Sequence, residues 1–396
     1  MNRAQRTVNG SATLVGMRTM IALGAMALAV AAAHAQWTLQ NSNSTASLRG
    51  IHSLGNGIAW ASGTNGTVLR TEDGGYLWQT CSIPPGAEKL DFRGVQAFDS
   101  NTAIVMSSGK GDLSRLYKTT DGCRSWKLIF TNPDKDGFWD AIRIDINNKQ
   151  FGSVIGDPVD GHFPIFVTFD KGEHWERRRI LPHAQDKEGL FAASNSSLSM
   201  YRTSNEEFVT GGPNGARLIS LEVCVGGEGD CFELGDFGPI KPNDPNRGRY
   251  EQVYWRTESL PLTRSDSAGA FSIATIVRSN FIRRVIVGGD YSKPDQQAGT
   301  AVYSSGMKWK TAETPPHGYR SAVAYAAATK TWITVGPNGT DISTDDGRNW
   351  RPVHPNPALH ETPDADRNWN ALSLPYVVGP HGRIGKLNSA ALTAPH

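Results

Sequence analysis

The sequence contains little cysteine and none of the short motifs that bind common cofactors. Its 396 residues include four cysteines and no C-x-x-C pair, so neither thioredoxin-like redox chemistry nor a zinc knuckle is indicated. No P-loop, G-x-G-x-x-G fingerprint, H-E-x-x-H helix or G-x-S-x-G elbow occurs. The formal net charge of +2 lacks the basic excess that is typical of nucleic-acid binders. We therefore expect no cofactor, no metal ion and no nucleic acid.

Long hydrophobic runs are also absent, apart from one near the N-terminus. Three arginines precede an apolar run from Met20 to Ala32, and an Ala-His-Ala sequence then ends at Ala35. This pattern predicts a secretory signal peptide over residues 1–35 that is cleaved after Ala35. The run of about 13 residues is shorter than the ~20 that a membrane-spanning helix needs. We expect a periplasmic or secreted protein, residues 36–396, with no transmembrane segment.

The four cysteines fall into two groups. Cys224 and Cys231 bracket a glycine-rich segment of six residues, which is flexible enough for them to form a local disulfide. Cys81 and Cys123 are 42 positions apart and can pair only if the fold brings them together, so their pairing is left open. Disulfides persist in the oxidising compartments to which a signal peptide leads.

Glycine and tryptophan, by contrast, are abundant and recur in one motif. An S/T-x-D-x-G-x-x-W box occurs four times, with its aspartate and tryptophan at Asp73 and Trp78, Asp121 and Trp126, Asp170 and Trp175, and Asp345 and Trp350. In such a box the carboxylate accepts hydrogen bonds from backbone N–H groups and the glycine adopts a left-handed conformation. The tryptophan fills the gap between neighbouring sheets. We therefore expect these aspartates to be structural rather than catalytic.

Two further patterns recur seven times. Short apolar segments flank turns such as Gly336-Pro337-Asn338-Gly339, as in β-hairpins. Seven first strands are predicted to start at Leu48, Phe92, Trp139, Phe191, Phe271, Tyr319 and Asn370. The residues after the signal peptide amount to about 52 per unit, close to the size of a large propeller blade. The sequence therefore predicts an all-β fold, a single seven-bladed β-propeller with Asp-box turns.

Two repeats depart from this regular length. The last one ends soon after Leu387 and is one strand short, and residues 36–40 are predicted to supply that strand and close the ring. The fourth is too long, and its extra residues, about 223–249, are rich in Gly, Pro and Asp. We expect an exposed loop insertion there, with the fourth strand resuming over residues 250–257.

Three of the predicted strand starts carry an arginine. In a propeller with these turns, the strand starts and the hairpins between second and third strands share one face, around the mouth of the central channel. This face would present Arg49, Arg93 and Arg320. Guanidinium groups bind carboxylates and phosphates in a bidentate manner, so the three residues predict an anionic ligand or partner at the mouth.

The boxes, the G-P-N-G turns, the strand-start arginines and the closing sequence from Gly379 to Ile384 resemble the photosystem II stability/assembly factor family. The resemblance covers the whole predicted mature chain. It implies an exported seven-bladed propeller without catalytic activity that holds a partner polypeptide on an arginine-rich face. Arg49, Arg93 and Arg320 would have that role here. We therefore predict a non-enzymatic assembly or stability factor for a polypeptide client, and expect it to be a monomer.

The alternative is a sialidase-like glycoside hydrolase, an exo-sialidase that acts on an anionic glycan. The three arginines would then bind the substrate carboxylate, Tyr291 would be the nucleophile, and Asp140 or Asp157 would supply the acid. The early F/Y-R-I-P sequence of that family is absent, because Phe92-Arg93 is followed by Gly-Val. No glutamate stands out near Tyr291, so the binding protein is favoured.

Overall fold

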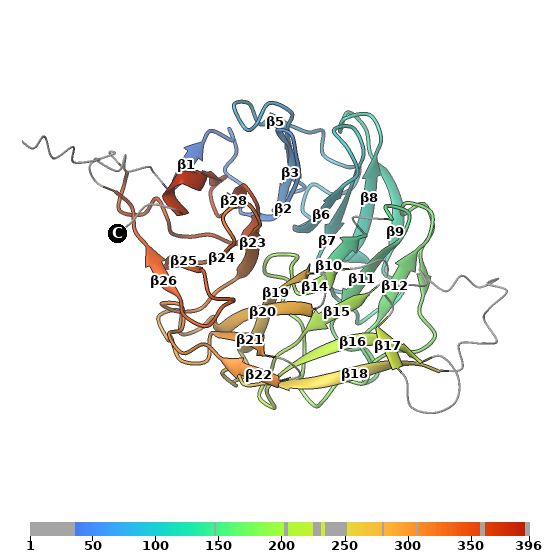
Figure 1. Cartoon of the computed structure of the whole chain (residues 1–396). Helices are drawn as coiled ribbons and strands as arrows, with labels where there is room; N and C mark the ends of the chain where they lie inside the picture. Colours follow the sequence, from blue (N-terminus) through green and yellow to red (C-terminus); the bar gives the residue numbers. More distant parts are fainter. Residues whose placement is uncertain are drawn as a thin grey trace, which may run out of the picture. The chain divides into compact units, whose positions relative to one another are not determined.

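Seven antiparallel sheets form a ring, with the first strand of each sheet nearest the centre (Figure 1). This computed structural model describes residues 36–145, 148–201, 205–224, 231–233, 252–278, 281–305, 308–356 and 361–392. Helical structure in these ranges is limited to two short 3-10 turns, η1 (Gly111–Leu113) and η4 (Ser389–Leu392). The predicted all-β, seven-bladed propeller is therefore confirmed.

Within each sheet the strands follow one another in chain order. The first sheet contains β2 (Leu48–Gly55), β3 (Ile58–Gly63), β4 (Val68–Thr71) and β5 (Gln79–Thr80). The second contains β6 (Phe92–Ala97), β7 (Ala103–Ser107), β8 (Arg115–Thr119) and β9 (Lys127–Thr131). The third contains β10 (Trp139–Ile144), β11 (Gly152–Gly156), β12 (Ile165–Thr168) and β13 (Glu176–Arg177). Because neighbouring strands are antiparallel, all first strands start at the same end of the ring, which we call the mouth.

The fifth to seventh sheets follow the same plan. The fifth contains β19 (Ala268–Arg278), β20 (Phe281–Asp290), β21 (Ala301–Ser305) and β22 (Lys308–Thr311). The sixth contains β23 (Ala322–Ala326), β24 (Thr331–Gly336), β25 (Gly339–Ser343) and β26 (Arg351–Val353). The seventh contains β27 (Ala371–Ser373), β28 (Tyr376–Val378), β29 (Ile384–Leu387) and, as its outer strand, β1 (Trp37–Gln40). The strand that the C-terminal repeat lacks thus comes from the N-terminal end of the described chain.

The fourth sheet differs from the other six. It contains β14 (Leu198–Met200), β15 (Glu206–Val209) and β16 (Ala216–Cys224), and β16 pairs with both β17 (Cys231–Glu233) and β18 (Gln252–Leu260). The fourth strand does resume where the sequence predicts, in β18. Most of the predicted insertion at 223–249 lies outside the described residues, and its first two residues belong to β16.

The prediction that the fourth first strand starts at Phe191 is wrong, because β14 starts at Leu198. Residues 191–197 instead reach four other sheets near the centre of the ring. The Asn195 side chain accepts a hydrogen bond from the Ile142 N–H at 2.8 Å, and the Ser194 hydroxyl donates to the Ser321 carbonyl at 2.7 Å. Polar side chains of this segment are bonded to other sheets, including the Ser196 hydroxyl to the Ser272 hydroxyl, so the segment lies among the inner strands rather than in its own sheet.

The four boxes are turns between third and fourth strands, at the end opposite the mouth. In the third sheet Asp170 Oδ1 accepts hydrogen bonds from the Thr168 hydroxyl at 2.9 Å and from the His174 N–H at 3.0 Å. Asp73, Asp121 and Asp345 make the corresponding bonds in their own turns. Trp78, Trp126 and Trp350 are buried and Trp175 is half-buried. The aspartates thus accept hydrogen bonds within their turns, and the tryptophans pack against the sheets.

A disulfide joins Cys81 to Cys123, with their Cα atoms 5.3 Å apart. Cys123 occupies the glycine position of the second box and keeps the left-handed backbone there, with a φ of 63°. The bond therefore ties the end of the first sheet to the box turn of the second. The strand register places Cys224 opposite Cys231, but their side chains lie outside the described residues, so that disulfide stays a prediction.

Candidate functional site at the mouth

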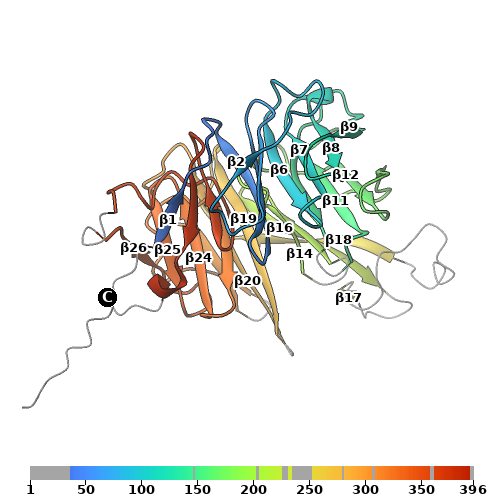
Figure 2. The same cartoon turned by 90° about the horizontal axis from the view of Figure 1, so that it is seen from above.

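The mouth carries the starts of the first strands and the turns between second and third strands. Figure 2 shows the ring turned by 90°, with the inner strands β2, β6 and β19 crossing its thickness. The box turns therefore lie at one end of these strands and the strand-start arginines at the other. A partner at the mouth would contact side chains other than those of the repeated boxes.

Arg49 and Arg93 lie together at the starts of two adjacent inner strands, and we call them the arginine pair. Both approach one carboxylate, since Asp91 Oδ2 is 2.8 Å from Arg93 Nε and 3.8 Å from Arg49 Nε. All three side chains are about a quarter to a third exposed, at 32 % for Arg49, 27 % for Arg93 and 24 % for Asp91. Two cations that share one anion leave an excess positive charge in reach of solvent.

The Arg49 guanidinium is incompletely satisfied. Its Nε is buried and has no hydrogen-bond partner among the described residues. Burial, and then the nearby charge of Arg93, lower the pKa of Arg49, and the charge of Asp91 offsets part of this shift.

Aromatic side chains lie beside the arginine pair. Phe191 stacks on Phe271 with the ring centroids 3.8 Å apart, and Tyr291 packs edge-on against both rings while 55 % exposed. Tyr319 is buried against Phe271 at 4.8 Å, and its hydroxyl lies close enough to Arg49 for each to shift the pKa of the other. The mouth thus combines a cationic centre with an aromatic cluster in which Tyr291 is exposed, Phe191 is half-buried and the other two rings are buried; we call it the aromatic patch (Phe191, Phe271, Tyr291 and Tyr319).

Two carboxyl groups of the third sheet, Asp140 and Asp157, lie on the mouth side, and Asp140 is close to Arg93. Asp140 is 1 % exposed, and burial followed by the charge of Asp157 raises its pKa well above the ordinary value. Burial also raises the pKa of Asp157, which accepts a hydrogen bond from the Leu190 N–H at 2.9 Å. Both groups therefore hold a proton more readily than a solvated carboxyl group, and Asp91 is the main counter-charge of the arginine pair.

Arg320 is not part of this site. The prediction that it presents its charge at the mouth is wrong, because its side chain is fully buried. Its Nε donates to Asp341 Oδ2 at 2.9 Å and its Nη1 donates to Asn338 Oδ1 at 2.6 Å. These acceptors belong to the hairpin of its own sheet. The corresponding hairpin of the first sheet has Val68 where the sixth has Asp341, a difference that is readable in the sequence.

Among the described residues, no side-chain hydrogen bond joins Tyr291 to Asp140 or Asp157, the residues of the predicted hydrolase site. The Asp140 carboxyl group is buried, and its Oδ2 has no hydrogen-bond partner among the described residues. Tyr291 is held by aromatic contacts. The neighbouring Asp290 accepts hydrogen bonds from three serine hydroxyls, which contribute to lowering its pKa to about 2 despite burial.

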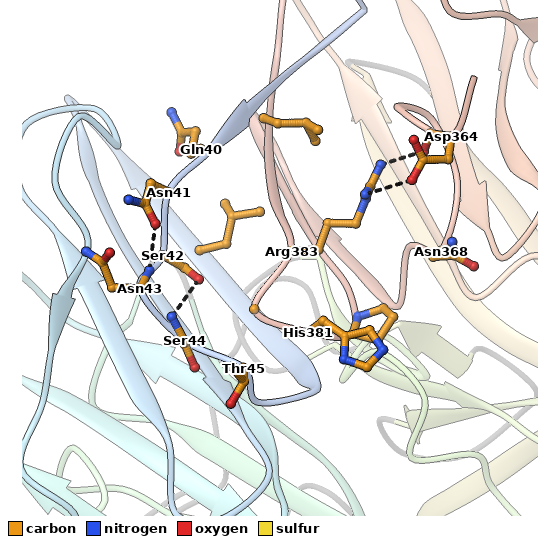
Figure 3. A pocket seen from close by; sticks show the side chains of 14 residues that line it. Gln40, Asn41, Ser42, Asn43, Ser44, Thr45, Asp364, Asn368, His381 and Arg383 are labelled. Atoms are coloured by element: carbon orange, nitrogen blue, oxygen red, sulfur yellow. Dashed lines mark hydrogen bonds and ion pairs between the residues drawn. The ribbon is translucent and has the colours of Figure 1, made fainter. Parts of the chain in front are cut away.

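Two clefts on the mouth face were not predicted from the sequence. One, of about 590 Å³, lies between residues 41–45, which lead into β2, and the turn that joins β28 to β29 (Figure 3). Polar side chains of the 41–45 segment form one wall, and Arg383, ion-paired with Asp364 at 3.3 Å, stands at the other. The second cleft, of about 600 Å³, runs beside Asp157, residues 184–191 and Asp266.

Among the described residues, no three His, Cys, Asp or Glu side chains are grouped so that they could hold a metal ion. Within the same ranges, no helix is long and apolar enough to cross a bilayer.

Neither a protein-family model nor a curated protein matches this sequence. Solved structures share its fold. YCF48 bound to D1 peptide has a TM-score of 0.54 at 15 % identity, covering 89 % of this chain and 97 % of that chain. YCF48 from Cyanidioschyzon merolae has a TM-score of 0.54 at 16 % identity, covering 90 % and 99 %. An ancestral GH74 enzyme has a TM-score of 0.47 at 12 % identity, covering 82 % and 40 %.

YCF48 is a photosystem II assembly factor. The resemblance to that family expected from the sequence is therefore confirmed at the level of the fold, which is what likeness at such identities shows. What this chain binds is therefore inferred from the side chains at its own mouth.

Proposed function

We propose that this chain is an exported, non-enzymatic binding protein that holds a polypeptide client on its mouth face, as an assembly or stability factor does. One observation supports this most directly: Arg49 and Arg93 share the single carboxylate of Asp91 and stay partly exposed. A cationic pair with one counter-ion and partly exposed side chains is suited to bind a carboxylate from another molecule.

The aromatic patch defines the other half of the client. Tyr291 exposes 55 % of its surface beside Phe191 and Phe271, and aromatic rings at interfaces bind apolar or aromatic side chains at low entropic cost. We propose a client segment with an acidic residue next to a large apolar one. The two mouth clefts would accommodate the chain on either side of that contact.

Export has independent support. The disulfide between Cys81 and Cys123 is of the kind that persists in oxidising compartments, where a signal peptide would deliver the chain. YCF48 bound to D1 peptide gives a propeller of the same fold with a polypeptide ligand, which favours a polypeptide here also. The comparison supports the class of partner rather than its identity.

The binding proposal is tested with fluorescein-labelled peptides. One probe contains Asp and Phe in a neutral background, and a second has the Asp replaced by Lys. Because charge-assisted hydrogen bonds contribute about 1.5–3 kcal/mol each, Arg49→Ala with Arg93→Ala should weaken binding of the acidic probe at least about tenfold. Fluorescence anisotropy measures the affinity, and binding should also weaken with salt.

The matched control is Arg348→Ala with Arg351→Ala, a pair of exposed arginines beside the fourth box, at the other end of the ring. This variant should bind the acidic probe like the unmodified protein. Equal binding of acidic and basic probes, or unchanged affinity in the arginine-pair variant, would overturn the proposal. Turnover of a fluorogenic sialoside that is lost in Tyr291→Phe would favour the hydrolase instead.

A further inference from the structure

The side chain of Gln36 is buried in an unusual way. The residue is 3 % exposed, and both its Oε1 and its Nε2 are buried without a hydrogen-bond partner among the described residues. Its carbonyl accepts a hydrogen bond from the Asn388 N–H at 2.9 Å. A primary amide buried with neither its donor nor its acceptor used is costly, and such groups in folded proteins call for an explanation.

Gln36 also directly precedes the strand that completes the seventh sheet. The next residue, Trp37, donates from Nε1 to the Thr340 hydroxyl at 2.9 Å and packs its ring 6.0 Å from that of Trp369. β1 pairs with β29 over its whole length. Gln36 is therefore held by its bond to Asn388 and by the packing of Trp37. Its amide cannot turn to solvent without disturbing the contact between β1 and the segment that follows β29.

Cleavage after Ala35 would place a second polar group at the same position. The new α-amino group of Gln36 would be protonated at neutral pH, and a charged group at a buried site is disfavoured unless it is paired. Among the described residues, no carboxylate pairs with Gln36. Glutamine is a residue whose own side chain can remove this charge, because its amide carbon lies within reach of its α-nitrogen in a five-membered ring.

We propose that Gln36 becomes the N-terminal residue of the exported protein and is cyclised to pyroglutamate. The neutral α-nitrogen forms a bond to Cδ, the Cδ–Nε2 bond breaks, and Nε2 leaves as ammonia with the proton from the α-nitrogen. No oxidant or reductant is needed. This modification site rests on the proposed export, because an internal glutamine cannot react in this way.

The product fits the buried position better than the reactant does. Cyclisation removes the ammonium charge and the unpartnered Nε2, and leaves a compact neutral lactam against the C-terminal turn around Asn388. A neutral end suits the strand that closes the ring, because the hydration of a charged amine no longer favours separation of β1 from β29. A lactam terminus also lacks the free amine that aminopeptidases require.

The test is the intact mass of the full-length chain after export. We expect a mature species that begins at Gln36 and is lighter by about 17 Da, the mass of the ammonia lost. Gln36→Ala, which leaves the Ala-His-Ala cleavage sequence unchanged, should begin at Ala and show no such loss. A mature species that begins at Gln36 with its full mass would overturn the inference and leave export intact.

An N-terminus at any other residue would overturn both the predicted cleavage site and this inference, without bearing on binding by the arginine pair. A second measurement follows the structural effect. Protein released with Gln36 first from a cytosolic fusion should lose about 17 Da during incubation, and its Tm should rise as it does so. A Tm that is the same before and after cyclisation would overturn the proposed role in stabilising β1.

Discussion

The box aspartates and the two mouth aspartates of the third sheet, Asp140 and Asp157, titrate in opposite directions, whereas Asp290 at the mouth has a lowered pKa like the boxes. The carboxylates of the boxes accept hydrogen bonds from turn N–H and hydroxyl groups, and these bonds lower the pKa of Asp121 to about 2. In the third sheet, burial raises the pKa of Asp140 and Asp157 at the mouth. The box end consists of repeated turns whose aspartates accept hydrogen bonds. The mouth retains carboxyl groups whose charged form is disfavoured by burial. Such local inconsistencies concentrate at functional sites.

The arginines repeat this comparison within one face. Arg93 and Arg320 hold the same position in their sheets, directly after an aromatic residue. Arg93 shares its carboxylate with Arg49 and is partly exposed, whereas Arg320 is enclosed by acceptors of its own hairpin. Equivalent sequence positions therefore have different roles. The residues of the facing hairpin determine whether the arginine is buried in a structural pair or stays partly exposed.

The largest expected effect separates these two arginines. Arg320→Ala would leave Asp341, which is fully buried, without its main counter-ion and should lower the free energy of unfolding by about 3–5 kcal/mol. Arg93→Ala removes a partly exposed ion pair and should cost about 1 kcal/mol or less. Urea denaturation followed by tryptophan fluorescence measures both. Similar losses in the two variants would show that Arg93 also has a structural role.

The disulfide should have the next largest effect. Cys81→Ser with Cys123→Ser opens a loop of 42 positions and should lower the free energy of unfolding by about 2–4 kcal/mol, because the unfolded chain is less restricted. The arginine pair lies at the opposite end of the same two sheets, so affinity for the acidic peptide should stay unchanged. Urea denaturation and anisotropy measure the two properties separately. A loss of binding as well would show that the two ends are coupled.

Removing a box carboxylate should lower the free energy of unfolding by less than removing the disulfide does. Asp170→Ala removes the acceptor for the Thr168 hydroxyl and the His174 N–H, and should cost about 1–2 kcal/mol, as the loss of a capping residue does. Asp136→Ala is the control, since Asp136 is a carboxylate that is 70 % exposed and pairs with Lys110 in solvent. That variant should differ from the unmodified protein by less than about 0.5 kcal/mol. Equal effects would contradict the structural role of the box.

The repeat made much of the fold predictable. Box turns and hairpins punctuate the chain at regular distances, and each element follows from local backbone chemistry, so sheet number and strand order could be predicted. The start of β14 could not, because residues 191–197 are held by side chains of Asn195 and Ser194 bonded to distant sheets. Contacts between residues far apart in sequence leave no local pattern.

The mouth was predictable only in part. Arg49 and Arg93 could be proposed from their position, while their shared partner Asp91 was overlooked although it is two residues before Arg93. The burial of Arg320 depends on Asp341, twenty-one positions later, and could have been suspected from the hairpin sequence alone. The clefts arise where loops of different sheets meet, so no single segment of the sequence encodes them.

The smallest expected effect is on the pH dependence of stability, and it tests the opposite titration directly. Asp121 has a lowered pKa in the folded protein, so its contribution is present above the ordinary carboxyl pKa of about 4 and is lost as pH falls toward 2. The pKa of Asp140 is raised, so folding is favoured by its proton at low pH and this contribution is lost as pH rises from about 4 toward neutrality.

Asp121→Asn should therefore lower Tm at neutral pH but not near pH 2, whereas Asp140→Asn should raise Tm at neutral pH relative to pH 4. Thermal unfolding from pH 2 to pH 8 measures both. If the two variants changed the profile in the same direction, the carboxyl groups at the mouth would be ordinary structural acids, and the contrast between the two ends of the ring would rest on the arginine pair alone.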